Sequence, residues 1–81
     1  MRFALTARFK RDYRKAATDV QERTDKALKF LLSDLQHPSL RAKIVDERRR
    51  IWQARVSDSW RIQFQIADDS LLVLQLFSHK D

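Results

Sequence analysis

The segment Ile51-Trp52-Gln53-Ala54-Arg55-Val56 is followed by Trp60-Arg61-Ile62-Gln63-Phe64-Gln65-Ile66, and both runs alternate apolar with mainly polar side chains. A period of two is typical of a half-buried β-strand. Ser57-Asp58-Ser59 between the runs has the composition of a turn, so the pattern predicts a β-hairpin. After a second turn at 67–70, we expect a third strand in which Leu72, Leu74 and Leu76 face the core.

The first 37 residues combine a short alternating run with two helical patterns. Residues 2–5 predict a strand, and Thr6 is placed to cap a helix that begins near Ala7. Two stripes at helical spacing follow, with a break expected at 22–25, and they comprise Phe9, Tyr13, Ala16, Ala17 and Val20, then Leu28, Leu31, Leu32 and Leu35. His37-Pro38 ends the second helix, and the two helices are expected to form an antiparallel hairpin.

The segment 38–50 lacks a clean period and is dense in charge, so we interpret it as a loop with at most one helical turn around 40–45. The resulting order is β-α-α-β-β-β. It predicts an α+β fold in which a mainly antiparallel sheet carries the helical hairpin on one face. We expect residues 1–81 to form a single domain, because a chain this short can build only one core.

The composition excludes several kinds of site. The chain contains no Gly, which excludes phosphate-binding P-loops and dinucleotide fingerprints, and no Cys, which excludes disulfides and zinc knuckles. Without Gly, Asp is expected at any position of positive φ. Two His and scattered carboxylates suggest no metal site, and we expect no cofactor. The short apolar start is interrupted at Arg8, which predicts a cytoplasmic protein without a membrane partner.

Positive charge is concentrated in two zones of a chain whose net charge is +6. Residues 1–15 carry six basic side chains against Asp12 alone. The second zone, residues 41–61, sets three acids against Arg41, Lys43, Arg48, Arg49, Arg50, Arg55 and Arg61. Clustered cations attract polyanions and acidic proteins, although a basic surface can also be merely solvated.

The alternation of the strands also predicts which side chains share a face. If Trp52, Ile62 and Leu74 face the helices, the opposite face carries Gln53, Arg55, Arg61, Gln63, Gln65, Gln75, Phe77 and His79. Such a set can hold phosphates, hydrogen-bond bases and stack on one of them. A solvated polar face is the ordinary alternative for an antiparallel sheet.

His79 is the candidate for proton transfer on this face, because its ordinary pKa lies near physiological pH. Cleavage of RNA through its own 2′-hydroxyl needs a proton acceptor, a proton donor and cations for the charge on the phosphate. His79 can supply one of the first two, and Arg55 and Arg61 can supply the last. The alternative is a surface histidine without a role.

Residues 51–57 and 60–64 resemble the "IWEARV…YRIxF" double strand of the RelE/ParE superfamily, the toxins of type II toxin–antitoxin systems. The flanking segments 37–40 and 76–81 are similar to those of the superfamily as well. The resemblance implies a β-α-α-β-β-β fold and neutralisation by a cognate antitoxin in a hetero-oligomer. On the RelE side it also implies an endoribonuclease that cleaves mRNA on the ribosome and so inhibits translation.

The resemblance assigns roles residue by residue. Arg61 matches the arginine that steadies the scissile phosphate, Arg55 an arginine on the preceding strand, and His79 a C-terminal histidine of ribonuclease members. The expected RNA-binding set is Lys43, Arg48, Arg49, Arg50, Gln63 and Lys80.

The sequence departs from the RelE pattern at two points. No aromatic residue follows His79, and no Glu occupies an obvious general-base position. Two alternatives therefore stay open: a ParE-like toxin that inhibits DNA gyrase by binding, and a non-catalytic basic binding domain.

Overall fold

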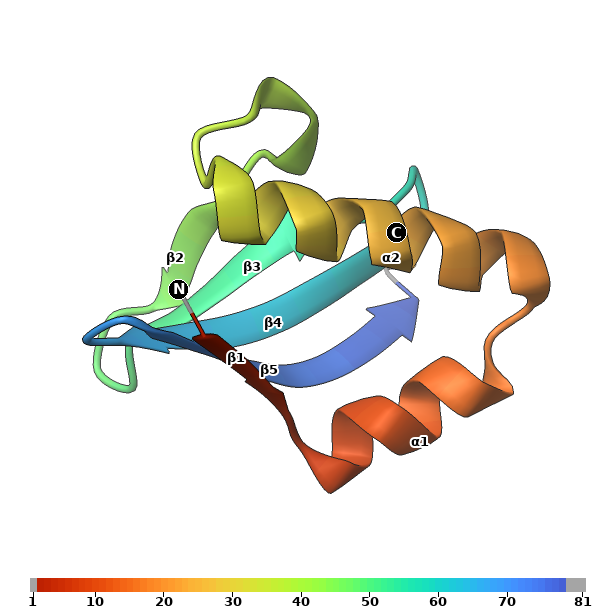
Figure 1. Cartoon of the computed structure of the whole chain (residues 1–81), viewed down its shortest axis with the longest axis horizontal. Helices are drawn as coiled ribbons and strands as arrows, with labels where there is room; N and C mark the ends of the chain where they lie inside the picture. Colours follow the sequence, from red (N-terminus) through yellow and green to blue (C-terminus); the bar gives the residue numbers. More distant parts are fainter. Residues whose placement is uncertain (1, 79–81) are drawn as a thin grey trace.

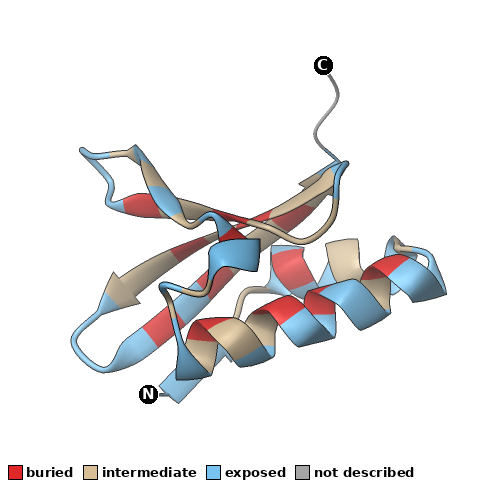
Figure 2. Cartoon of the chain, turned by 90° about the horizontal axis from the view of Figure 1, so that it is seen from above, coloured by how far each residue is buried: buried red, intermediate tan, exposed pale blue. Residues whose placement is uncertain are grey.

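The structure, a computed structural model, describes residues 2–78 as a five-stranded sheet with two helices (Figure 1). The elements are β1 (Arg2–Leu5), α1 (Ala7–Lys15), α2 (Thr18–Ser33), the 3₁₀ helix η1 (Pro38–Leu40), β2 (Lys43–Asp46), β3 (Ile51–Arg55), β4 (Trp60–Ala67) and β5 (Ser70–Ser78). The strand order is β1-β5-β4-β3-β2, in which only β1 and β5 are parallel. Both helices lie on one side of the sheet (Figure 2), which confirms the predicted α+β fold.

The predicted β3–β4 hairpin forms with the expected alternation. Trp52 pairs with Phe64 and Ala54 with Ile62, and three of these four side chains are fully buried on the helix side of the sheet. Burial of one large apolar side chain contributes about 1.5–3 kcal/mol to folding. This pairing therefore fixes the register of the hairpin, since a shift by one residue would expose the whole set.

The prediction for the last strand was wrong in its first half. Leu71 and Val73 are buried, whereas Leu72 is 36% exposed. The reason is a β-bulge: Gln63 pairs with Gln75 but Phe64 pairs with Val73, so Leu74 is an extra residue in β5. A bulge reverses the alternation at the point where it occurs. Leu76, beyond the bulge, is buried as predicted.

Two expectations for the middle of the chain were also wrong. The break between the helices falls at Ala16 and Ala17, because Thr18 and Asp19 form the first turn of α2 and Gln21 Nε2 donates to Tyr13 O across the break (2.7 Å). The predicted loop at 38–50 contains η1 and the edge strand β2, which pairs with β3 over a short and irregular register. No helix among the described residues is long and apolar enough to cross a membrane.

Three residues between 2 and 78 have positive φ: Arg41 at 47°, Arg50 at 58° and Asp68 at 54°. The expectation that aspartate takes every such position was wrong, because it holds at Asp68 but the other two positions are arginines. A non-glycine residue in the left-handed region is disfavoured, so the tertiary contacts of these two turns maintain an unfavourable backbone conformation.

Helix α1 is anchored to the sheet through two polar side chains at the bulge. Thr6 caps the helix by accepting from Phe9 N (3.0 Å), and its hydroxyl donates to Leu74 O (2.7 Å). Leu76 N donates to the carboxylate of Asp12 (3.1 Å). Because β1 pairs with β5 only as far as Val73, these side chains satisfy backbone groups of β5 beyond the end of the paired strand.

We expect Asp12→Ala to lower the free energy of unfolding by about 1–3 kcal/mol, because it removes the acceptor of a partly buried backbone N–H. Asp12→Asn keeps an oxygen acceptor, so it should lower the free energy of unfolding by clearly less than Asp12→Ala does. Urea unfolding followed by circular dichroism measures both. Equal stability of Asp12→Ala and the parent would show that the contact with Leu76 does not hold α1 in place.

Candidate nucleic-acid interface

The face of the sheet away from the helices, here called the open face, carries two parallel rows of polar side chains. Cross-strand pairing links Lys43 to Gln53, Gln53 to Gln63, and Gln63 to Gln75. The neighbouring row pairs Arg55 with Arg61 and Arg61 with Phe77. The structure thus brings Arg55, Arg61, Gln63 and Lys43 together on one surface, as the alternation predicted for the first three.

The two arginines lie directly opposite one another and both turn toward the β3–β4 turn. Arg61 Nη1 donates to Ser57 O at 2.6 Å and to Trp60 O at 2.9 Å. Arg55 Nε donates to the same Ser57 O (3.3 Å), and its Nη2 pairs with the exposed carboxylate of Asp58. Like charges opposite each other in a sheet repel, so these acceptors hold in place a pair that would otherwise separate.

A concavity of ≈ 240 Å³ lies beside this pair, lined by Arg41, Lys43, Gln53, Ala54, Arg55 and Arg61. Four of its six lining residues are cationic, which suits an anion such as a phosphate. Sequence reasoning placed Arg41 in the basic zone but not in the site. The feature that sets Arg41 apart is its positive φ at the end of η1, which cannot be seen in the sequence.

The other predicted basic residues lie at the opposite end of β3. Residues 47–50, here called the arginine turn, connect β2 to β3 and precede Ile51, which itself lies about 13 Å along the strand from Arg55 at roughly 3.3 Å per residue. Arg48, Arg49 and Arg50 therefore form a basic surface separate from the residues that line the concavity, and their predicted contact with RNA stays a prediction.

The arginine turn is held by Asp46 and Gln65. The Asp46 carboxylate accepts from Arg49 N (3.0 Å) and Arg49 Nε (2.9 Å), and Gln65 Nε2 donates to Arg49 O (2.7 Å). The backbone and side-chain hydrogen bonds from Arg49 lower the pKa of Asp46 below its ordinary 3.8. One of the three arginines is thus partly neutralised within the turn.

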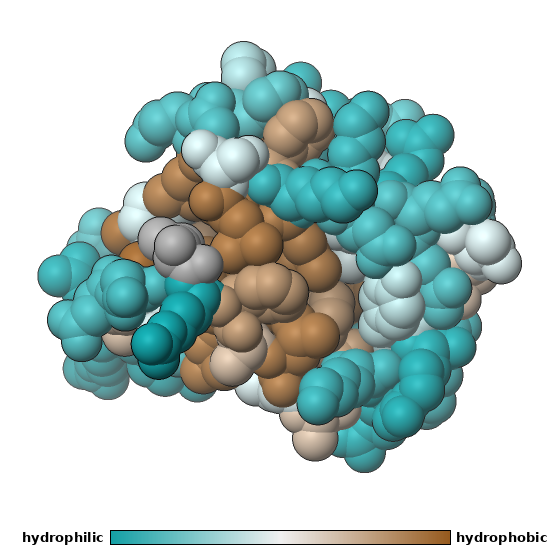
Figure 3. Space-filling view, viewed as in Figure 1, coloured by the Kyte–Doolittle hydropathy of each residue, from teal (hydrophilic) through white to brown (hydrophobic). Residues whose placement is uncertain are grey.

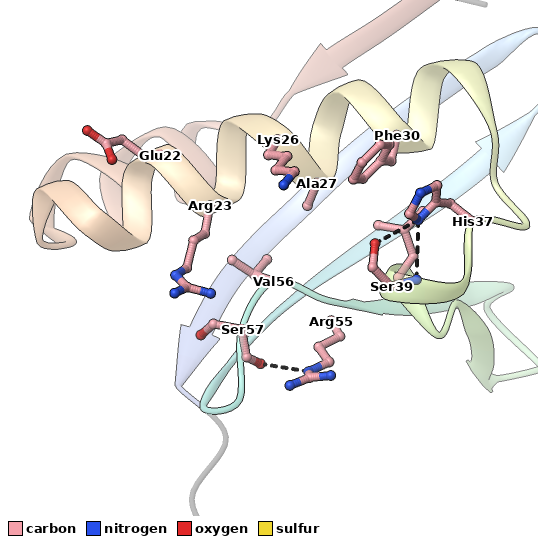
Figure 4. Close-up of a pocket in the computed structure, with 11 residues that line it drawn as sticks. Glu22, Arg23, Lys26, Ala27, Phe30, His37, Ser39, Arg55, Val56 and Ser57 are labelled. Carbon is pink, nitrogen blue, oxygen red and sulfur yellow. Dashed lines mark hydrogen bonds between the residues drawn. The ribbon is translucent and has the colours of Figure 1, made fainter.

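A larger cavity of ≈ 740 Å³ lies between α2 and the end of β3 (Figure 4). Arg23, Lys26 and Phe30 of α2 face it on one side and Arg55 on the other. Phe30 stacks on His37 with ring centroids 3.8 Å apart, and His37 Nδ1 accepts from Ser39 N (3.2 Å). His37, interpreted from the sequence only as a helix terminator, therefore also caps η1 and packs against α2.

His79 and Lys80 lie outside the described residues, so their predicted roles stay predictions. The four cationic side chains that line the concavity all come from the segment 41–61, which is the second basic zone of the sequence. Within residues 2–78, no group of three or more His, Asp or Glu has the arrangement of a metal site.

Several solved structures share this fold at low sequence identity. The YoeB/ParE toxin from Agrobacterium tumefaciens is 14% identical, with a TM-score of 0.82, 99% of this chain covered and 100% of that one. The isolated RelE toxin of E. coli is 17% identical, with a TM-score of 0.78 and coverages of 99% and 85%. The intact RelBE toxin–antitoxin complex of E. coli gives 16% identity, a TM-score of 0.74 and coverages of 99% and 98%. The fold is therefore that of the RelE/ParE superfamily toxins.

Comparison with family models gives the more specific assignment. Residues 3–81 match the model described as the ParE toxin of the type II toxin–antitoxin system parDE, so the chain belongs to this family of toxins. No curated protein is similar enough in sequence to be counted as a relative.

We expect the amide resonance of Arg49 to titrate with a midpoint below 3.8, because it reports on the Asp46 carboxyl whose pKa is lowered. The hydrogen bonds to the charged carboxylate stabilise the turn above the ordinary pKa and are lost as the pH falls through the lowered value. NMR titration measures this midpoint, and Asp46→Asn should abolish the titration of the Arg49 amide resonance. A midpoint at or above 3.8 would contradict the proposed contact.

Proposed function

We propose that this toxin is a ribosome-dependent endoribonuclease that acts in the cytoplasm and stops translation by cleaving mRNA without a metal ion. The observation that carries the proposal is the Arg55–Arg61 pair, held side by side beside the cationic concavity on the open face. Two guanidiniums in a fixed orientation suit the charge that develops on a phosphate during transesterification.

The chemistry starts from the 2′-hydroxyl of the RNA. Its oxygen attacks the adjacent phosphorus, its proton passes to a base, and the leaving 5′-oxygen receives a proton from an acid. Arg61, with Arg55 beside it, stabilises the negative charge on the phosphate oxygens in the transition state. His79 is the proposed acid or base, and Lys43 and Arg41 attract the RNA backbone.

The arginine turn extends this proposed surface. Because it lies at the other end of β3, Arg48 and Arg50 would contact the backbone at a nucleotide distant from the scissile one, or the ribosomal RNA around it. Such contacts contribute affinity that depends on salt but not on sequence. Together with Lys80 they complete the proposed RNA-binding set.

We further propose that a cognate antitoxin neutralises the toxin in a hetero-oligomer. Hydrophobic side chains gather between α2 and α1 on the helix side of the molecule (Figure 3). Half-buried apolar residues at the margin of the core include Leu5, Leu28 and Leu35. An amphipathic antitoxin helix suits this surface, and an acidic extension would cover the cations.

The proposed activity predicts mRNA cut at codon positions when the purified toxin is added to a reconstituted translation system. Primer extension maps the cuts, and the same RNA without ribosomes serves as the control. Intact mRNA together with inhibition of DNA supercoiling would instead identify a gyrase inhibitor. Intact mRNA, normal supercoiling and unaffected growth of cells that express the protein would identify a non-catalytic binding domain.

Arg61→Lys should lower the rate of cleavage by roughly 10²–10³-fold, because an ammonium cannot reproduce two oriented donors at the phosphate. Arg14→Lys, an equivalent change on the exposed surface of α1, is the matched control and should cleave normally. Thermal melting must accompany the assay, since Arg61 also holds the carbonyl of Ser57. Full activity of a normally folded Arg61→Lys would remove Arg61 from the mechanism.

A further inference from the structure

Three glutamines form a continuous hydrogen-bonded ladder across the open face. Gln63 Nε2 donates to Gln53 Oε1 (3.1 Å), and Gln75 Nε2 donates to Gln63 Oε1 (2.6 Å). The three residues are direct cross-strand partners on β3, β4 and β5, and all three are half-buried. The amides are therefore fixed in orientation while part of each side chain stays accessible to solvent.

The ladder leaves a defined pattern of donors and acceptors. An amide has two N–H donors and two lone pairs on its oxygen, and Gln63 uses one of each within the ladder. Both bonds run in the same direction, which leaves the amino group of Gln53 free within the ladder at one end and the oxygen of Gln75 at the other. Oriented amides of this kind read the edges of nucleobases, whereas cations alone bind phosphates regardless of sequence.

The row beside the ladder supplies what a bound nucleotide needs besides edge contacts. Phe77 lies two residues beyond Gln75 on the same face and offers a ring on which a base can stack. Arg61, its cross-strand partner, and Arg55 offer guanidiniums for the adjoining phosphate. Stacking, edge recognition and phosphate binding thus lie within two neighbouring rows of one sheet.

We propose that the ladder Gln53–Gln63–Gln75, with Phe77, is a nucleobase subsite that selects the base of a single-stranded RNA next to the phosphate held by Arg55 and Arg61. The inference rests on the proposed function in that its ligand is RNA, but it concerns binding and requires neither cleavage nor a ribosome. A ladder that only ties the strands together would give no preference among bases.

The test compares two matched variants. Gln63→Leu interrupts the ladder at its centre, whereas Gln36→Leu makes the same chemical change at an exposed position outside the sheet. Fluorescence anisotropy measures binding of 2′-O-methyl hexanucleotides, which cannot be cleaved through the 2′-oxygen. The probes are A₆, C₆, U₆ and an abasic hexamer with the same phosphates.

We expect the parent protein to bind at least one of the three base-bearing probes about tenfold more tightly than the abasic probe. Gln63→Leu should reduce that ratio to within about threefold, while the dependence of affinity on salt stays the same because the phosphate contacts remain. Gln36→Leu should keep the ratio of the parent. If Gln63→Leu does not fold, Phe77→Leu serves instead and should lower affinity for the base-bearing probes only.

Equal binding of base-bearing and abasic probes by the parent would overturn the subsite, and so would an undiminished ratio in a folded Gln63→Leu protein. The outcome is separable from that of the proposed nuclease. A base preference in a protein that leaves mRNA intact on ribosomes would support the subsite and remove the nuclease. Cleavage of mRNA on ribosomes without any base preference would support the nuclease and overturn the subsite.

Discussion

The bulge at Leu74 is the constraint on which both the core and the open face depend. Before it, Leu71 and Val73 point into the core. After it, Leu76 does so while Gln75 and Phe77 point to the open face. A regular strand would have to bring one of these two sets to the wrong side, because side chains alternate without exception in an unbroken ladder. The single extra residue lets one strand contribute apolar side chains to the core and also Gln75 and Phe77 to the open face.

The helices and the bulge stabilise one another. Thr6 and Asp12 bond the backbone of β5 at and just after the extra residue, where β1 no longer pairs with it. The one acid among the first fifteen residues is therefore used for structure, which leaves the six basic side chains of that segment uncompensated except for the Arg8–Asp12 contact. The positive field of α1 is thus a consequence of how α1 is attached to the sheet.

The hairpin was predictable because its pattern has one interpretation: Ala54 and Ile62 are apolar positions flanked by polar ones, and only one register buries both. The segment 71–76 is different, since Leu71 to Leu74 are all apolar and no alternation shows which of them face inward. Strand β2 was missed for a similar reason, because four residues with two charged ends give too short a pattern to separate a strand from a loop. Without β2, residues 47–50 could not be recognised as a turn between two strands.

Departures from local rules in this chain coincide with its basic zone. Arg55 faces Arg61 across the hairpin although like charges there are destabilising, and Arg41 and Arg50 occupy left-handed backbone positions that asparagine or glycine would adopt more easily. Each of these departures carries a conformational or electrostatic cost, and each places a guanidinium on a turn or on the open face. Natural sequences break such rules mainly where function requires it. An anion bound between Arg55 and Arg61 would turn their mutual repulsion into a shared attraction, which gives the unfavourable pair its physical rationale.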